Sequence, residues 1–507
     1  MFHKMFQRAG AFMLAACVAF STVPFSSLQV NASEGIEAVI AGITQPQISM
    51  DGKRISMPDA PEGVDVRFCA DYKQVIGEDG TIYAPYEDKV VKGFYEVSDG
   101  GGKRQSEEFT ITVPGKYAPM EGANEKPSVI PELQEWYGIQ GQFAVCQTSK
   151  IVADHELLDT AAEFAADYKD LTGIVLPVVE GSYADVSRGD FYLTFDTEDE
   201  GLGKEGYILK IGEAAVVEAA DRTGAYWGVV SILQILKQTN GTIAKGFVRD
   251  YPKYEVRGLS LDVGRKPIEM DTVKQFAKNM SWYKLNSFQV HLNDNLIFFE
   301  DYPTMDEAME KAYAAFRLES DVENEKTGVK LTAEDLFYTK DEFRSFIQDS
   351  RKIGVDVIPE FDMPAHALAI TRVFDQYMSK VSGGQHKYLI DELDISQDEA
   401  IQIAKDIWAE YLEGDDPVFD EETTIHIGTD EFHGGSNGNE AFRKFSDEMI
   451  EYIQSTGRKV RMWGSLSNKS GTTPVRSEGV QLNMWANNYA DPRTMYNAGY
   501  DLINTQY

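Results

Sequence analysis

The spacing of hydrophobic and polar positions changes three times along the chain. Between residues 35 and 140, short stretches of alternating apolar and polar residues are separated by turn clusters such as Glu78-Asp-Gly80 and Asp99-Gly-Gly-Gly102. Alternation with a period of two predicts strands that bury one face. This region therefore predicts a small β-sandwich-like module, which serves either in carbohydrate contact or as a spacer.

The region from 142 to 250 mixes two periodicities. Leu157–Leu171 and Thr223–Gln238 show the spacing of amphipathic helices, while residues 190–195 and 206–211 are typical of strands. The mixture predicts an α+β domain ahead of the next region.

From residue 254 onward, apolar strand-like segments alternate with helical ones. Strands are predicted to begin near Arg257, Phe288, Asp356, Thr423, Lys459, Val480 and Asp501, with helices between most of them, including 270–283, 340–351, 400–412 and 439–454. Repeated strand–helix units predict a parallel sheet, and this many units predict a (β/α)8 TIM-type barrel. Seven strands precede Tyr507, so we expect 254–507 to be a barrel without its last strand, in a fragment of a longer protein.

The first 32 residues have the pattern of a secretory signal. Lys4 and Arg8 precede an apolar run, and Val30-Asn-Ala32 offers a small-residue cleavage site. A lipoprotein anchor at Cys17 is the weaker alternative, because apolar residues continue beyond that cysteine. No other apolar run has the length of a membrane span, so the mature protein is expected to be secreted or on the cell surface without a transmembrane segment.

The charge balance excludes some classes of partner. The formal net charge is −34, and loss of Lys4 and Arg8 with the signal would make it −36. Such a surface repels phosphate backbones, which argues against nucleic acid and anionic membranes but not against neutral sugars. Solubility alone accounts for most of this charge. Cys69 and Cys146 could pair, but two cysteines do not make a disulfide framework.

Polar and aromatic residues follow the predicted strands at their C-terminal ends, where such barrels build their active sites. In strand order they are Asp262 and Arg265; His291 and Asp294; Glu360, Asp362 and His366; Asp430 and Glu431; Trp463; and Trp485. Each has an ordinary structural interpretation when taken alone, such as a helix cap, a satisfied core histidine or a packed indole. Together they favour sugar cleavage, because indoles stack on pyranose rings while acids transfer protons. No His-Glu-x-x-His motif or Cys/His cluster is present, so no metal or cofactor is expected.

Three segments in order carry a specific resemblance. Tyr254–Asp262, Pro359–His366 and His426–Glu431 resemble glycoside hydrolase family 20, over roughly residues 145 to 507. Three further segments, Leu261–Lys266, His291–Asn295 and Ala315–Ser320, are similar to the branch that contains bacterial lacto-N-biosidases.

The resemblance implies that Glu431 is the general acid/base and that Asp430 holds the 2-acetamido group of the substrate. In that chemistry the acetamide oxygen attacks the anomeric carbon, so no protein nucleophile is needed. We expect the charge of Asp430 to raise the pKa of Glu431.

The resemblance also implies roles for residues around the acids. Asp294 and His366 would support the acid, Arg257 would bind sugar hydroxyls, and Trp463 with Trp485 would line the pocket. A tyrosine that binds the acetamide oxygen belongs after the seventh strand, and Tyr507 lies too early to be assigned to it.

These expectations predict a retaining exo-glycosidase that removes terminal β-linked GlcNAc or GalNAc from glycans through an oxazolinium intermediate. One alternative is a lacto-N-biosidase that releases a disaccharide. The other is an inactive or truncated carbohydrate-binding surface protein, suggested by the β-rich module and the incomplete barrel.

Overall fold

A computed structural model describes residues 34–99, 102–239, 241–297, 301–380, 389–434 and 438–506. The predicted signal segment with Cys17, and Tyr507, lie outside the described residues. Within these ranges, no helix combines the length and the apolar content that crossing a membrane requires.

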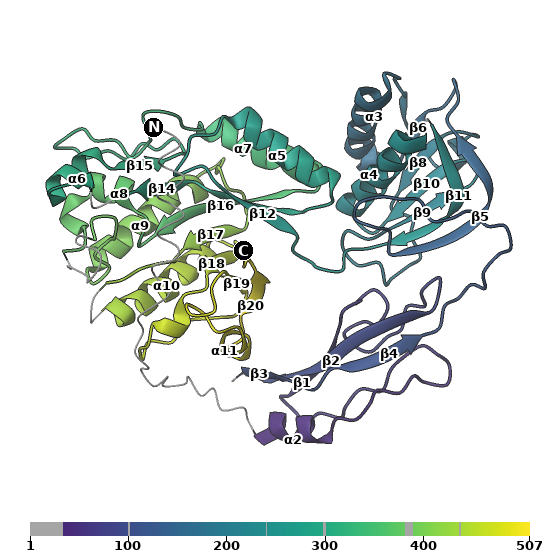
Figure 1. Cartoon of the computed structure of the whole chain (residues 1–507), viewed down its shortest axis with the longest axis horizontal. Helices are drawn as coiled ribbons and strands as arrows, with labels where there is room; N and C mark the ends of the chain where they lie inside the picture. The colour runs from purple at the N-terminus through teal and green to yellow at the C-terminus, as the bar shows by residue number, and fades with distance from the viewer. Residues whose placement is uncertain are drawn as a thin grey trace. The chain divides into compact units, whose positions relative to one another are not determined.

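The N-terminal module is a small antiparallel sheet. Its elements are α2 (Glu34–Gly42), β1 (Asp65–Ala70), β2 (Lys89–Asp99), β3 (Gly102–Gln105) and β4 (Phe109–Val113). The long strand β2 pairs with β1, β3 and β4 (Figure 1). Phe68, Tyr95 and Phe109 fill its core with edge-on ring contacts. The predicted β module thus has one four-stranded sheet among the residues described here.

The second region is an α+β domain with a seven-stranded mixed sheet. Its strands are β5 (Glu135–Ala144), β6 (Ile151–Ala153), β7 (Val178–Glu180), β8 (Phe191–Thr194), β9 (Tyr207–Ile211), β10 (Ala215–Ala219) and β11 (Thr242–Asp250). They lie in the order β5-β11-β9-β10-β8-β6-β7. Helices α3 (Leu158–Thr172) and α4 (Arg222–Thr239) pack together on one side of this sheet (Figure 1). Strand β5 crosses the boundary predicted near residue 140, because its first residues already pair with β11.

The third region is a parallel sheet of seven strands. They are β12 (Gly258–Asp262), β13 (Ser287–His291), β16 (Asp356–Met363), β17 (Ile425–Gly428), β18 (Val460–Trp463), β19 (Val480–Met484) and β20 (Asp501–Asn504), neighbours in that order. The main helices between them are α5 (Met270–Trp282), α7 (Lys340–Lys352), α9 (Asp398–Leu412), α10 (Gly438–Ser455) and α11 (Pro492–Asn497). The predicted incomplete TIM-type barrel is confirmed, and in the described residues β12 and β20 are edge strands that do not pair with each other.

An insertion after β13 supports the loop that follows β12. It contains the hairpin of β14 (Asn293–Leu296) and β15 (Tyr313–Phe316), with α6 (Met305–Lys311) between the two strands. The fully buried Arg317, just after β15, donates from Nε to the Val263 carbonyl at 2.8 Å and from Nη2 to the Gly264 carbonyl at 3.3 Å. These bonds fix the backbone immediately before Arg265.

The interior of the parallel sheet is unusually polar. TIM barrels are filled mainly by branched apolar side chains. Here the inward positions are buried polar residues, each less than 9% exposed: Gln289, His291, Glu360, Asp362, His426, Arg461 and Asn483. Burying polar groups is unfavourable unless each has a partner, so a polar interior is costly to build. Departures of this kind from the usual filling are expected at functional sites.

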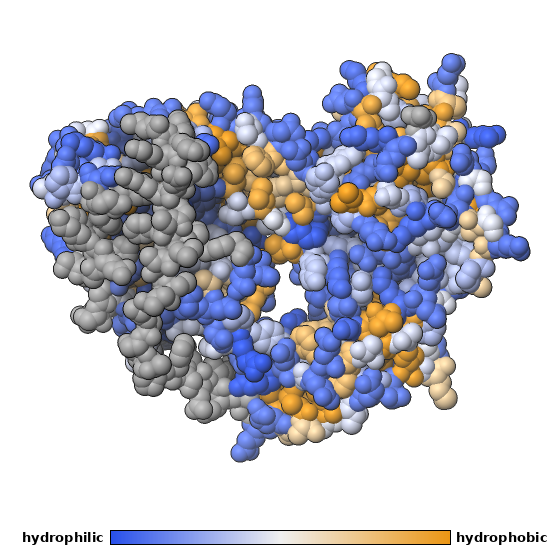
Figure 2. Space-filling view, viewed as in Figure 1, coloured by the Kyte–Doolittle hydropathy of each residue, from blue (hydrophilic) through white to orange (hydrophobic). Residues whose placement is uncertain are grey.

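The surface is mostly hydrophilic. Figure 2 shows hydrophilic residues over most of the face it displays, with groups of apolar residues between them. The exposed apolar side chains include Val90 in the N-terminal module and Val175 near β7. The hydrophobic content is concentrated in separate cores, and each of the three regions contains one large core.

Candidate active site

The acid pair lies in a tight turn at the end of β17. A Cβ on Gly428 (φ 73°) would come within 2.2 Å of the Asp362 carboxylate, so only glycine fits there. Thr429 and Glu431 also have positive φ, at 86° and 44°. Left-handed backbone in such residues costs about 1–3 kcal/mol each and clusters at functional sites. The turn lets both Asp430 and Glu431 approach His366, although successive strand residues would point apart.

His366 lies between the acid pair and Asp294. Its Nδ1 is 3.0 Å from Asp294 Oδ1, while its Nε2 is 3.4 Å from Glu431 Oε2 and 3.8 Å from Asp430 Oδ1. The backbone of His366 is also left-handed, at φ 56°. The structure therefore brings together the four residues for which the sequence predicted catalytic and supporting roles.

Asp294 is buried among cationic donors. His291 Nε2 and Arg265 Nη2 each lie 2.7 Å from its Oδ2. Burial alone would raise the pKa of Asp294, but His366 and His291 hold it well below its usual range. In the same way, burial would lower the pKa of His366, but the carboxylates of Asp294 and Asp430 raise it well above its usual range. At neutral pH the site thus contains a carboxylate at Asp294 and an imidazolium at His366.

The pKa of Glu431 is lowered, contrary to the expectation from the sequence. The main cause is the His366 imidazole, whose Nε2 lies 3.4 Å from Glu431 Oε2, and its effect outweighs the opposing effect of burial. The sequence showed the neighbouring Asp430 but not the imidazolium that lies within 4 Å of both carboxylates. In the free protein Glu431 is therefore ionised at neutral pH.

Asp362 lies behind the acid pair as a neutral acid. Burial first, and then the charge of Asp430, raise the pKa of Asp362 well above its usual range. Its Oδ1 accepts a hydrogen bond from the Thr429 backbone N–H at 3.1 Å, which ties it to the turn. Asp362 therefore supports the backbone that carries both acids.

Three groups of described residues are compact enough to surround a cation. They are Asp262, His291 and Asp294; His291, Glu360 and Asp362; and Asp362, His366 and Asp430. In the first group the guanidinium of Arg265 already neutralises both aspartates, at 2.8 and 2.7 Å. The histidines of the other two groups are held as cations by neighbouring carboxylates, and a cationic imidazole does not ligate metals. That the site works without a metal stays a prediction.

Two tryptophans lie at the C-terminal ends of β18 and β19, the same end of the sheet at which the acids follow β17. Trp463 is the last residue of β18 and donates from Nε1 to Glu360 Oε1 at 2.6 Å. Trp485 directly follows β19, and its buried Nε1 has no hydrogen-bond partner among the described residues. The ring of Tyr489 packs on it with centroids 4.4 Å apart. Burial, with the charges of Glu431 and Asp430, raises the pKa of Tyr489 to about 12, so its phenol lies near the acids. The sequence reasoning missed Tyr489, since a tyrosine four residues after a tryptophan is a weak signal.

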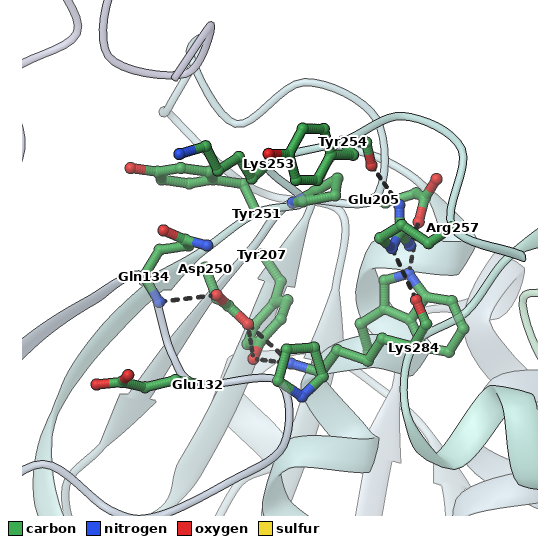
Figure 3. Close-up of a pocket in the computed structure, with 13 residues that line it drawn as sticks. Glu132, Gln134, Glu205, Tyr207, Asp250, Tyr251, Lys253, Tyr254, Arg257 and Lys284 are labelled. Atoms are coloured by element: carbon green, nitrogen blue, oxygen red, sulfur yellow. Dashed lines mark hydrogen bonds and ion pairs between the residues drawn. The ribbon is translucent and has the colours of Figure 1, made fainter. Parts of the chain in front are cut away.

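The prediction that Arg257 binds the sugar is wrong. Arg257 precedes β12 and so lies at the N-terminal end of the sheet, opposite to the acids. It lines a pocket of about 170 Å³ together with Glu205 (Figure 3). Glu205 Oε2 is 2.5 Å from Arg257 Nη2. Its other donors reach the carbonyls of Tyr254 and Lys284 at 2.8 and 2.9 Å. Arg257 therefore joins the α+β domain to the barrel.

Arg265 is the arginine that the fold places with the acids. It follows the C-terminal end of β12 by three residues and pairs with Asp262 and Asp294. The rule that C-terminal strand ends build the site distinguishes the two arginines by position alone. That rule could have selected Arg265 from the sequence.

Comparisons with known proteins agree with this architecture. Residues 126–251 match glycosyl hydrolase family 20, domain 2, and residues 254–507 match the glycosyl hydrolase family 20 catalytic domain. A lacto-N-biosidase of Bifidobacterium bifidum is 25% identical over 405 residues, which cover 75% of this chain and 33% of that protein. A β-hexosaminidase of Vibrio furnissii is 26% identical over 384 residues, which cover 69% of this chain and 57% of that protein. The chain thus spans between a third and somewhat more than half of these relatives.

Solved structures show the same fold. The β-N-acetylhexosaminidase of Bacteroides fragilis superposes with a TM-score of 0.57 at 20% identity, over 74% of each chain. The N-acetyl-β-hexosaminidase of Streptomyces plicatus also gives 0.57 at 20% identity, over 76% of this chain and 75% of that one. With half of its residues matching the catalytic domain and the preceding domain matching as well, the chain belongs to glycosyl hydrolase family 20.

Proposed function

We propose that the protein is a retaining exo-glycosidase that removes terminal β-linked N-acetylhexosamine from glycans. The observation that carries this proposal is the position of Asp430 and Glu431 on one turn, with His366 within 4 Å of both. The hexosaminidases among its relatives support the same reaction class. The pattern of residues 1–32 supports the further proposal that the protein acts after export.

The proposed reaction proceeds in two steps and needs no protein nucleophile. In the first, the acetamide oxygen of the substrate attacks the anomeric carbon while Glu431 gives its proton to the departing glycosidic oxygen. Asp430 accepts the acetamide N–H and balances the positive charge of the oxazolinium. In the second step, Glu431 takes a proton from water as the water attacks the anomeric carbon. This attack opens the oxazolinium ring and restores the acetamide.

The cationic neighbour of Glu431 sets the pH range of this reaction. The first step requires protonated Glu431, so kcat/KM falls as pH rises through the pKa of Glu431 in the free enzyme. His366 lowers that pKa, so kcat/KM should begin to fall at a pH below the pKa of an ordinary glutamate. We therefore expect an acidic pH optimum.

Replacing His366 by asparagine is expected to move this alkaline limb toward neutral pH. The neutral amide removes the positive charge next to Glu431, so the pKa of Glu431 rises and more of the enzyme is protonated at a given pH. The measurement is the pH profile of kcat/KM on an aryl β-GlcNAc glycoside. The maximal rate should also fall, since support of the acid is lost. A limb that stays in place, or moves to lower pH, would show that His366 does not control Glu431.

A substrate panel tests the proposed function itself. Aryl β-GlcNAc and β-GalNAc glycosides should be hydrolysed, and a thiazoline mimic of the oxazolinium should inhibit competitively. The match to a lacto-N-biosidase favours a second candidate, in which the same acids release a disaccharide. Preference for an aryl β-lacto-N-bioside would establish that second activity. A folded full-length protein that cleaves none of these substrates would instead favour the binding role.

A further inference from the structure

A fully buried glutamate that the proposed reaction does not use lies beneath the site. Glu360 projects from β16 into the interior of the sheet and has no exposed surface. Burying an unpaired carboxylate is very unfavourable, so its partners must compensate. Three donors do so: Trp463 Nε1 at 2.6 Å, Gln289 Nε2 at 2.7 Å and His291 Nδ1 at 3.0 Å. They come from β18 and β13, so Glu360 joins strands on both sides of β16.

One of these donors connects Glu360 to the support of the acid. His291 has Glu360 Oε2 3.0 Å from Nδ1 and Asp294 Oδ2 2.7 Å from Nε2. Only an imidazolium can donate at both nitrogens, so His291 is a cation between two carboxylates. Burial opposes this, but Glu360 and Asp294 raise the pKa of His291 well above its usual range. His291 therefore links the Asp294 carboxylate directly to Glu360.

A second donor connects Glu360 to the tryptophan at the end of β18. His426 also approaches Glu360 Oε1, at 3.5 Å, but its Nδ1 accepts a hydrogen bond from the Gly428 backbone N–H at 3.1 Å. That nitrogen carries no proton, and burial lowers the pKa of His426 to about 4. Among the described residues, Trp463 Nε1 is thus the donor that satisfies Glu360 Oε1. The bond fixes the rotation of the indole beside the acids.

A continuous series of contacts therefore runs from the indole to the acid. In order it passes through Trp463, Glu360, His291, Asp294, His366 and Glu431. We propose that Glu360 is a positioning residue that sets both the Trp463 indole and the Asp294–His366 support of Glu431. The kinetic part of this inference rests on the proposed function. A single buried carboxylate would then align the side of the pocket that contacts the sugar with the side that transfers the proton.

Replacing Glu360 by glutamine tests the inference directly. Glutamine keeps the shape, but its amide N–H₂ must replace either Oε1, which faces Trp463 Nε1, or Oε2, which faces Gln289 Nε2 and His291 Nδ1. In both orientations the N–H₂ meets a donor. Loosening of the site by this conflict should lower kcat/KM on aryl β-GlcNAc by about 100-fold. The six tryptophans give a simple ¹⁵N indole NMR spectrum, in which Trp463→Phe identifies the Trp463 signal. That signal should shift and exchange faster with solvent in Glu360→Gln.

A double-mutant cycle separates positioning from general loss of stability. If Glu360 acts partly by holding Trp463, then Glu360→Gln combined with Trp463→Phe should be little slower than Glu360→Gln alone. If the double variant instead loses kcat/KM by the product of the two single losses, this part of the inference is overturned. Glu135→Gln is the matched control, because Glu135 is a buried glutamate of the α+β domain that accepts from Arg249 and Tyr251, each at 2.8 Å. That variant should lose stability but keep its kinetic constants.

The NMR measurement keeps the test independent of catalysis. If the wild-type protein cleaves no substrate, the proposed function fails, while the Trp463 signal still reports on Glu360. A Trp463 signal that is unchanged in Glu360→Gln overturns the inference whatever the activity. Should that variant not fold, Glu360→Asp keeps the charge but withdraws the carboxylate by one methylene. It should still shift the Trp463 signal while leaving the alkaline limb of the pH profile in place, and an unshifted signal again overturns the inference.

Discussion

Replacing Glu431 by glutamine is expected to lower kcat on β-linked GlcNAc disaccharides by about 10²- to 10⁴-fold, the usual contribution of a general acid. The loss should be much smaller on a dinitrophenyl β-GlcNAc glycoside, because that leaving group departs without a proton. Steady-state kinetics on the two substrates measures this difference. Equal losses on both would show that Glu431 is not the proton donor.

The companion variant Asp430→Asn should behave differently. Asp430 is proposed to orient the acetamide and stabilise the oxazolinium, which both leaving groups require, so its loss should be similar on the two substrates. Glu399→Gln provides a matched control, since Glu399 is an exposed acid on α9. That variant should keep wild-type kinetics on both. The contrast between adjacent acids assigns their roles more sharply than either loss alone.

The barrel was predictable because its strands and helices have clear local signals. The predicted start of β12 near Arg257 and the observed start at Gly258 differ by one residue, and Thr423 and Ile425 for β17 differ by two. The helix predicted over residues 340–351 is α7, and Thr339 caps it, with Oγ1 accepting from the Glu342 backbone N–H at 3.1 Å. Apolar periodicity and capping are properties of neighbouring residues, so a sequence displays them directly.

The electrostatics of the site could not be predicted from neighbouring residues in the sequence. His366 precedes Glu431 by many residues in the chain, and only the folded sheet brings the imidazolium beside it. The Trp463–Glu360 bond likewise joins residues 103 positions apart. The sequence showed which groups reach the strand ends, but the sign of the Glu431 pKa shift depends on distances that the packing of four strands determines.

The junction between the α+β domain and the barrel contains a second buried charge system. Lys284 and Asp250 are only 5% and 6% exposed, and Lys284 Nζ lies 2.7 Å from Asp250 Oδ2 (Figure 3). Tyr207 donates to the same carboxylate at 2.8 Å. Lys284 also has a left-handed backbone, φ 55°, just after α5, where glycine would be less strained. The strain is explained if the ammonium is needed to neutralise Asp250.

Replacing Lys284 by methionine is therefore expected to lower the free energy of unfolding by about 3–5 kcal/mol, because it leaves Asp250 buried without its cation. Denaturant unfolding followed by tryptophan fluorescence measures the loss. Lys352→Met is the control, because Lys352 is 47% exposed in its pair with Asp349. This substitution should cost less than about 1 kcal/mol.

Adding Asp250→Asn to Lys284→Met should recover part of the stability, because the unpaired charge disappears. A double variant less stable than Lys284→Met would show that the charge is not the cause. Because the pair lies near the N-terminal ends of the strands, the pH profile of the remaining activity should stay that of the wild type.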